Sequence, residues 1–339
     1  TSLVYADLQT GALGAAFSIS STRFLIGPAV GLAYPARGEV TFVRDATGAA
    51  NGLIWTAEGT PPLQAQRVPV DTTEVTYPGG DGPSRLAGRL VTPRSPGRHP
   101  AVVLVHGAGK VTRRNWQTDL LSGLFALHGL ATLSYDKRGV GDSEGVYVGG
   151  IASAQNISLL GRDALAGVAY LQSRADIDAA QIGLQGSSQA GWIIPYAAAE
   201  SPDVAFMLLW SGPGVSQGIS DLYDNLAETT APAQLAETLR ETPASGFDPL
   251  PYLARIRVPG FWAYGDRDLT VPVPESIAKL AALRAAGHPD FTWQVFPTGD
   301  HDLWTVDSPT GDDLRLSPGF APGLFPAMHT WLEAHIDAK

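Results

Sequence analysis

The sequence predicts an α/β fold in which helices flank a mostly parallel β-sheet. From about residue 71 to the C-terminus, apolar runs of strand length alternate with amphipathic helical segments, as right-handed strand–helix–strand crossovers require. Residues 101–105 form a continuous apolar run, which is typical of a central parallel strand buried on both faces. The 339 residues, 44% of them apolar, suffice for one large domain or for a catalytic domain with a small appendage.

Residues 1–70 predict a small antiparallel β-domain. Polar and apolar residues alternate over 39–44, and two further short strands are expected at 53–56 and 64–68, with Gly- and Pro-rich turns between them. The segment contains no histidine and no dense group of polar residues. We therefore expect it to pack, to shape the substrate site or to mediate a homodimer rather than to perform chemistry.

Residues 71–339 predict the catalytic domain. Strands at 73–77 and 85–91 flank the turn residues 78–82, which indicates a hairpin at the start of a mixed sheet. The segment at about 213–256 interrupts the alternation, and its helical pattern at 220–240 predicts a short cap over the carboxyl edge of the sheet. Further strands are expected at 101–105, 131–135, 182–184, 206–210, 260–264 and 291–296, and helices at 120–127, 157–174, 192–199, 275–287 and 320–336.

Composition excludes several classes of function. A formal net charge of −10 with no basic stretch argues against nucleic-acid binding. No apolar run reaches the roughly 18 residues that a membrane-spanning helix needs. The absence of cysteine excludes disulfides, cysteine nucleophiles and cysteine zinc sites. The chain begins Thr-Ser-Leu, and we expect a removed upstream segment such as a signal peptide, which favours a secreted or periplasmic location over a cytoplasmic one.

A serine lies at a predicted strand-to-helix corner. The sequence Gly-Ser-Ser-Gln-Ala at 186–190 matches the Gly-x-Ser-x-Gly elbow that exposes a nucleophilic hydroxyl, except that alanine replaces the last glycine. Ser188 is the candidate nucleophile rather than Ser187, because it is centred between Gly186 and Ala190. The extra methyl group leads us to expect backbone strain at Ala190.

A serine nucleophile needs a base, and the base needs a carboxylate that fixes its tautomer. His301 is the candidate base because it alone among the histidines follows a strand at the catalytic edge. Asp266 and Asp268 both follow the strand at 260–264, and Asp268 is preferred because Gly-x-x-Asp-x-x-Val-Pro resembles hydrolase acid loops, while Asp266 could hold the turn. The order Ser188, Asp268, His301 is the order of such hydrolases. The competing histidines are His99, His106, His128, His288, His329 and His335.

The negative oxygen that develops during acyl transfer needs preorganised N–H donors. The candidates are the backbone N–H groups of Gln189, which follows the serine, and of Ala108, in the loop after the central strand. The sequence His-Gly-Ala-Gly at 106–109 resembles the His-Gly loop of lipases and esterases, in which we expect His106 to have a structural role.

No cofactor and no metal are predicted. The loop at 106–110 does not match the phosphate-binding Gly-x-x-x-x-Gly-Lys pattern, and Gly139-x-Gly141 lacks the third glycine of a dinucleotide fingerprint. Solvated turn carboxylates explain the acidic loop residues better than a metal does, because they show no ligand spacing. These residues are Asp136, Asp142, Asp300 and Asp302.

Four ordered motifs, at 103–109, 135–145, 182–191 and 265–268, together resemble the bacterial α/β-hydrolases of the serine-aminopeptidase-like and dienelactone-hydrolase-like esterase group. The resemblance covers about 71–339. It implies an α/β-hydrolase fold and a cofactor-free carboxylesterase acting on small-molecule esters with short or medium acyl groups. It also implies that Asp136 and Arg138 brace the loop near the nucleophile. Ala190 departs from the family pattern, and so does Gln189, where an acidic residue is common.

Alternatives on the same scaffold are a peptidase, an acyltransferase or a thioesterase. A peptidase needs a charged handle for a peptide terminus, and the acidic residues of the cap could bind an amine, although a solvated helix face explains them better. These residues are Asp221, Asp224, Glu228 and Glu237. A non-catalytic pseudo-hydrolase that binds a partner through the β-domain is a further alternative, against which the complete set of triad candidates argues.

Overall fold

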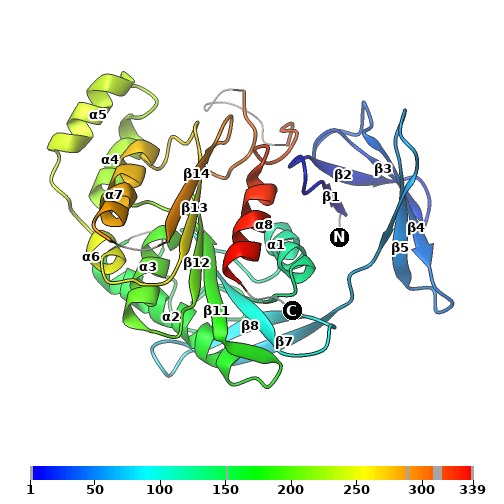
Figure 1. The fold of residues 1–339 in the computed structure, drawn as a ribbon, viewed down its shortest axis with the longest axis horizontal. Coiled ribbons are helices and arrows are strands. Elements are labelled where there is room, and N and C mark those ends of the chain that lie inside the picture. The colour runs from blue at the N-terminus through cyan, green and yellow to red at the C-terminus, as the bar shows by residue number, and fades with distance from the viewer. Residues whose placement is uncertain (1–2, 150–151, 288–289, 308–314, 337–339) are drawn as a thin grey trace.

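The computed structural model describes residues 3–149, 152–287, 290–307 and 315–336, which form two sheets (Figure 1). The first sheet is a six-stranded antiparallel meander in sequence order. Its strands are β1 (Val4–Ala6), β2 (Leu13–Ser18), β3 (Arg23–Ile26), β4 (Gly38–Arg44), β5 (Ala50–Thr56) and β6 (Leu63–Gln66). The sequence pattern indicated the strands near 39–44, 53–56 and 64–68 and missed the first three.

The second sheet has eight strands in the order β14-β13-β12-β11-β9-β10-β8-β7. The β7–β8 and β8–β10 pairs are antiparallel, and the other neighbouring pairs are parallel. The predicted α/β-hydrolase fold is therefore confirmed. The strands are β7 (Val70–Pro78), β8 (Arg85–Pro93), β9 (His99–Val105), β10 (Ala131–Tyr135), β11 (Ile177–Ser187), β12 (Phe206–Trp210), β13 (Gly260–Gly265) and β14 (Phe291–Phe296).

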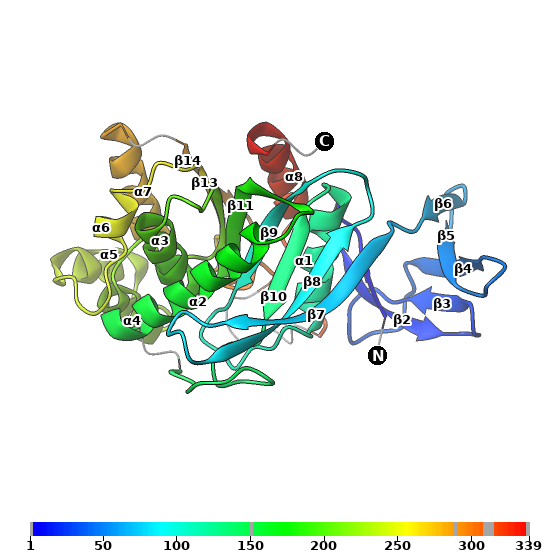
Figure 2. The same ribbon diagram turned by 90° about the horizontal axis from the view of Figure 1, so that it is seen from below.

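Helices cover both faces of this sheet (Figures 1 and 2). Side chains alternate along β9, so that Val102 and Leu104 pack in the core beneath α1 and α8, while Val103 and Val105 pack beneath α2 and α3. This two-sided burial explains the continuous apolar run of the central strand. The helices are α1 (Trp116–Leu127), α2 (Ala154–Gln172), α3 (Ala190–Glu200), α4 (Gln217–Leu226), α5 (Pro232–Glu241), α6 (Leu250–Leu253), α7 (Val273–Ala285) and α8 (Leu324–His335). Among the described residues, no helix is both long and apolar enough to cross a membrane.

In the segment expected to form the cap, the helical pattern at 220–240 divides into two helices, α4 and α5, and the short α6 follows. The first helix, α4, ends at Leu226, and the backbone is extended at Ala231, whose ψ is 135°, before α5 begins at Pro232. Proline disfavours a helical residue before it but suits the first position of a new helix, so the sequence carried a signal for this break. A small cluster that includes Ile219 and Leu235 holds α4 and α5 together.

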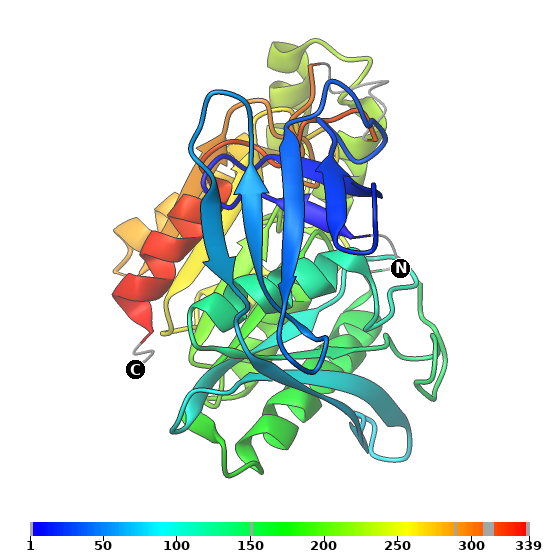
Figure 3. The same cartoon turned by 90° about the vertical axis from the view of Figure 1, so that its right-hand side faces the viewer.

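The N-terminal sheet packs against the segment that precedes α8 (Figure 3, where α8 is red). Leu13 is fully buried in the same core as α1 and α8. Its N–H donates to the Pro318 carbonyl at 2.8 Å, and the N–H of Phe320 donates to the Gly11 carbonyl at 2.9 Å. These two bonds join Gly11 and Leu13, at the start of β2, to Pro318 and Phe320, which lie between His301 and α8 in the chain.

Candidate active site

Ser188 occupies a sharp turn between β11 and α3. Its φ of 56° lies in the left-handed region, where a non-glycine residue is strained, as at many functional sites. The turn is held by the Ser188 N–H, which donates to the Trp210 carbonyl at 3.0 Å, and by the Gly191 N–H, which donates to the Ser188 carbonyl at 2.8 Å. The strain expected at Ala190 is thus found at Ser188 instead, because Ala190 already begins the helix.

Small residues around the turn are required by close packing. A Cβ at Gly186 would lie 2.5 Å from the Ala190 methyl and 2.6 Å from the Val105 carbonyl oxygen. A Cβ at Gly191 would lie 2.5 Å from the Gly212 Cα. The elbow therefore tolerates alanine in the last motif position because the glycine that its packing needs comes one residue later.

Asp268 follows β13 and is only 3% exposed. Its Oδ1 accepts hydrogen bonds from the N–H groups of Thr270, at 2.8 Å, and Val271, at 2.9 Å. The Tyr223 hydroxyl of α4 donates to the Asp268 carbonyl at 2.9 Å, so the cap also contacts this loop. Asp266 is exposed and instead accepts a 2.7 Å bond from the Thr298 N–H, which fastens the turn.

His301 lies in the loop after β14. Its Nδ1 is 3.0 Å from Asp268 Oδ2 and 3.1 Å from Oδ1. Burial lowers the pKa of His301, but the charge and hydrogen bond of Asp268, with Asp302 and Asp300 adding to them, raise it overall above its ordinary value of 6.5. Because Nδ1 faces Asp268, the other ring nitrogen, Nε2, remains available to other partners.

Ser188 and His301 line one cavity of about 300 Å³ at the carboxyl edge of the sheet. Backbone of Gly107 and Ala108 forms another wall, and apolar side chains such as Leu121 complete it. Within the described residues, no hydrogen bond joins the Ser188 hydroxyl to His301. Such bonds between a nucleophile and its base are often long in the absence of substrate.

The two expected N–H donors border the serine. A Cβ on Gly107 would lie 3.7 Å from the Ser188 Cβ, which places the 107–108 backbone directly against the elbow. In the described part of the chain, neither the Ala108 N–H nor the Gln189 N–H donates a hydrogen bond to another residue. Both donors are therefore free to bind an oxygen atom of a ligand.

His106 is buried at the end of β9, with its ring centroid 4.4 Å from that of Tyr135. Burial and the nearby charge of Lys137 lower the pKa of His106 to about 3. It is therefore neutral at physiological pH and packs as part of the core.

Lys137 was not singled out from the sequence, yet it reaches the candidate site. It is 1% exposed, and its ammonium group donates to the carbonyls of Gly107 and Ala108 and to the side chain of Gln189. Burial lowers the pKa of Lys137 to about 8. The only hint in the sequence was its place between two other charged residues after a buried strand.

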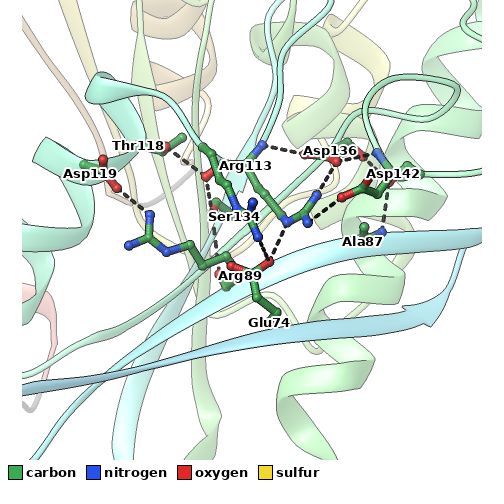
Figure 4. Close-up of polar contacts among 11 residues, drawn as sticks. Glu74, Ala87, Arg89, Arg113, Thr118, Asp119, Ser134, Asp136 and Asp142 are labelled. Atoms are coloured by element: carbon green, nitrogen blue, oxygen red, sulfur yellow. Dashed lines mark hydrogen bonds and ion pairs between the residues drawn. The ribbon is translucent and has the colours of Figure 1, made fainter. Parts of the chain in front are cut away.

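Arg113 lies at the centre of a polar network beside the site (Figure 4). Its guanidinium pairs with the buried Asp136, with Asp142 at 2.7 Å and with Glu74 at 2.8 Å. The Asp136 carboxylate also accepts the Arg113 N–H at 2.7 Å and the Asp142 N–H at 2.8 Å. This network joins the 106–115 loop to the 136–145 loop.

The remaining acidic candidates make contacts within the protein. Asp300 Oδ1 accepts the N–H groups of Asp302, at 2.9 Å, and Trp304, at 2.8 Å, which shapes the His301 loop. Arg138 pairs with the buried Asp163 on α2, as expected for a bracing residue. Among residues the structure describes, no three carboxylate or imidazole side chains gather as a metal site.

Comparisons with known proteins bear on the family and the fold of the chain. The sequence model of the prolyl oligopeptidase family matches residues 124–316. No curated protein matches the chain. Among solved structures, an acylaminoacyl peptidase of Pyrococcus horikoshii is similar with a TM-score of 0.60 and 14% identity, covering 100% of this chain and 55% of its own. The esterase Pf2001 of Pyrococcus furiosus is similar with a TM-score of 0.53 and 19% identity, covering 68% of this chain and 85% of its own.

The structural similarity to these two proteins establishes the fold. The family match covers more than half of the chain, including the elbow serine and the loops of Asp268 and His301. The chain is thus a serine hydrolase of the α/β-hydrolase fold and belongs to the prolyl oligopeptidase family.

Proposed function

We propose that this protein hydrolyses carboxylic esters through an acyl-enzyme formed on Ser188. The observation that carries the proposal is that Ser188 and His301 line one cavity and that His301 is paired with the buried Asp268 behind it. Three loops, each following a different parallel strand, bring these groups together. Such an arrangement suits acyl transfer, in which a base and a fixed carboxylate activate the hydroxyl.

In the proposed mechanism, Ser188 Oγ attacks the ester carbonyl carbon while His301 takes the hydroxyl proton. The N–H groups of Ala108 and Gln189 donate to the oxyanion of the tetrahedral intermediate. The intermediate collapses, the bond to the alcohol oxygen breaks, and His301 returns the proton to the leaving alcohol. Water then attacks the acyl-enzyme with His301 as base, which releases the acid and restores the serine. Asp268 holds the imidazole and stabilises its charged form.

The lining of the cavity favours a neutral acyl group. Its volume of about 300 Å³ suits a short chain. Among the described residues, Asp302 is the one carboxylate in the lining. The acidic cap residues that could have bound an amine do not line it, so the cavity offers little to a free peptide amino terminus. These residues are Asp221, Asp224, Glu228 and Glu237.

A second cavity of about 850 Å³ borders the first and provides room for the rest of a substrate. Asn115 lines both cavities, and the first turn of α1 stands between them, with Trp116 on one side and Gln117 on the other. Val4 and Val30 from the N-terminal region form the far wall. Charged side chains such as Arg114 also line it, beside Trp116 and Trp304, and we propose that this cavity receives an aromatic part of the substrate beyond the scissile bond.

Peptide-bond hydrolysis is the second candidate function. It is favoured by membership of the prolyl oligopeptidase family and by the fold similarity to an acylaminoacyl peptidase along the whole chain. A blocked, neutral amino terminus would fit the cavity better than a charged one. Both reactions would use the same acyl-enzyme chemistry.

The test compares three chromogenic substrates at equal concentration: p-nitrophenyl butyrate, an N-acetylated amino-acid p-nitroanilide, and the same anilide with a free amino group. We expect kcat/KM to be highest for the ester and lowest for the free amine. Turnover of the acetylated anilide at a rate similar to that of the ester would support the peptidase candidate. Cleavage of the free-amine anilide alone would contradict the ester proposal.

A further inference from the structure

The loop after β10 carries three consecutive charged residues that point in different directions. Asp136 binds Arg113, and Arg138 binds Asp163 on α2. Lys137, between them, extends toward the cavity of Ser188 and is 1% exposed. The two flanking ion pairs fix the backbone on either side and so determine where the lysine side chain can reach.

The ammonium of Lys137 finds one acceptor for each of its three N–H donors. It lies 2.7 Å from the Gly107 carbonyl oxygen, 3.2 Å from the Ala108 carbonyl oxygen and 3.0 Å from Gln189 Oε1. These acceptors belong to the two segments that supply the proposed oxyanion donors. One side chain therefore joins both halves of that site.

The shortest of these contacts has a direct geometric consequence. The carbonyl of Gly107 and the N–H of Ala108 belong to the same planar peptide group, and in a trans peptide they point in opposite directions. Fixing the carbonyl of Gly107 on Lys137 therefore fixes the direction of the Ala108 N–H. A hydrogen bond to a carbonyl also polarises its amide, which makes the N–H a stronger donor.

The charge of Lys137 lies behind the peptide group whose N–H would donate to the developing negative charge. Among the described residues, no carboxylate forms an ion pair with its ammonium, although a buried unpaired charge is costly. Its three protein partners are neutral groups. A lysine that merely filled space could be replaced by an apolar residue at a gain in stability, so the retained charge points to a role in the reaction.

We propose that Lys137 is a positioning residue that orients the Ala108 and Gln189 N–H groups and, through the peptide group that it polarises, strengthens their stabilisation of the oxyanion. This inference rests on the proposed acyl-transfer function and adds to it a residue that acts in the tetrahedral intermediate more than in the substrate complex. Removing the charge is therefore expected to lower kcat rather than to raise KM.

Other titratable groups near the ammonium are few. His106, at the end of β9, lies near enough for the charge of Lys137 to lower its pKa, and it stays neutral. The Tyr147 ring lies 5.6 Å from the Lys137 ammonium and 5.5 Å from that of Lys110, and the Tyr147 hydroxyl donates to the Ala108 carbonyl at 2.8 Å. Lys110 is exposed and donates no hydrogen bond among the described residues, so it provides a matched control lysine in the same loop.

The experiment compares Lys137→Met, Lys137→Arg and the control Lys110→Met in the full chain. We expect Lys137→Met to lose about 10²–10³-fold in kcat on p-nitrophenyl butyrate, as when one oxyanion donor is removed, with KM little changed. Affinity for a trifluoromethyl ketone, whose adduct with serine carries the oxyanion, should fall in parallel. Affinity for a non-reactive substrate analogue should stay constant. Lys137→Arg should recover part of the rate, and Lys110→Met should resemble the wild type.

A pH profile of the wild-type protein gives a test that does not depend on the folding of a variant. Because burial lowers the pKa of Lys137 to about 8, kcat should decline as pH rises through that value, and Lys137→Arg should move this decline to higher pH. The inference would be overturned by a folded Lys137→Met variant that keeps the wild-type kcat and the wild-type affinity for the ketone. It would also be overturned by a wild-type pH profile in which kcat does not decline on the alkaline side. The proposed function fails separately, if Ser188→Ala keeps its activity.

Discussion

The carboxylate of Asp268 is fixed by its own loop before it contacts His301. Two backbone N–H groups hold Oδ1, and the side chain is almost fully buried. This preorganisation leaves the imidazole one orientation in which Nδ1 meets both carboxylate oxygens. At the scale of single residues, the site is thus a set of side chains whose positions are determined by backbone hydrogen bonds.

Replacing Asp268 by Asn should lower kcat by about 10⁴-fold, because an amide cannot hold the imidazole in the tautomer that accepts the serine proton. Asp266→Asn is the matched control from the same loop, and it should leave kcat close to that of the wild type, because the exposed Asp266 carboxylate accepts the Thr298 N–H rather than a bond from His301. Initial rates on p-nitrophenyl butyrate test both variants. A loss in the second variant alone would assign the acid to Asp266.

The raised pKa of His301 predicts the acid side of the pH profile. The base must be neutral to accept a proton, so kcat/KM should fall as pH drops through a value above 6.5. In Asp268→Asn the opposing effect of burial dominates, and the residual activity should persist to lower pH. An acid limb that does not move in this variant would contradict the assigned pair.

Sequence patterns predicted Ser188, Asp268 and His301 as the candidate triad because each follows a recognisable strand, and the structure brings the three loops together. They did not locate Lys137, because the sequence of three charged residues gives no indication of which side chain turns inward. That direction depends on two ion pairs with residues distant in the sequence. Arg113, which precedes the loop, binds Asp136, and Asp163, which follows it, binds Arg138. The sequence patterns also placed the backbone strain at Ala190 instead of Ser188, because they did not show that α3 begins at Ala190.

At the scale of elements, loops rather than strands carry the site, and buried ion pairs hold these loops. Arg113 in the 106–115 loop binds Asp136, at the start of the 136–145 loop, and both side chains are nearly fully buried (Figure 4). Removing one partner leaves the other charge without compensation in a poorly solvated place. The network therefore links the stability of the fold to the position of the proposed oxyanion site.

Asp136→Asn should lower the free energy of unfolding by about 3–5 kcal/mol, the range for breaking a buried ion pair. Asp119→Asn is the control from a neighbouring pair with Arg89, in which the Asp119 side chain is 58% exposed, and it should cost about 0–1 kcal/mol. Urea denaturation of both variants measures the difference. Equal effects would show that the Arg113 network does not hold the loops.

The alternation of strands and helices in this domain could be predicted from the sequence, because most of its strands are continuous apolar runs and most of its helices are amphipathic over several turns. The first three strands of the N-terminal sheet could not, because short segments rich in glycine and alanine, such as 13–18, give a weak alternation. The helical pattern at 220–240 did not show that two helices form there, and Pro232, which begins the second helix, was the one local signal of the division. Proline disfavours the helical conformation in the residue before it, and this restriction outweighed a polar–apolar helical pattern that continued past Ala231.

At the scale of the whole molecule, the N-terminal sheet is joined to the catalytic domain beside the His301 loop. Hydrogen bonds around Leu13 and Phe320 make this contact, and the second cavity lies next to it. Trp116, 38% exposed, packs edge-on against Trp304 with their ring centroids 5.7 Å apart. The sequence could not indicate this role, because residues 1–70 contain no functional motif and the contact joins the two ends of the chain.

Trp116→Ala should raise KM for esters with a large aromatic group beyond the scissile bond and leave KM for p-nitrophenyl acetate unchanged. The reason is that the indole lines the second cavity but not the first. Steady-state kinetics on a short and a long ester, with Leu127→Ala as an exposed control on the same helix, measure this difference. An equal change for both substrates would argue against the second cavity as a substrate site.

The central claim is that Ser188 is the nucleophile, and reaction with a fluorophosphonate tests it most directly. Mass spectrometry of the labelled protein should place one adduct on Ser188, the Ser187→Ala variant should label normally, and Ser188→Ala should neither label nor hydrolyse p-nitrophenyl butyrate. An adduct on another residue, or a Ser188→Ala variant that keeps most of its activity, would contradict the claim.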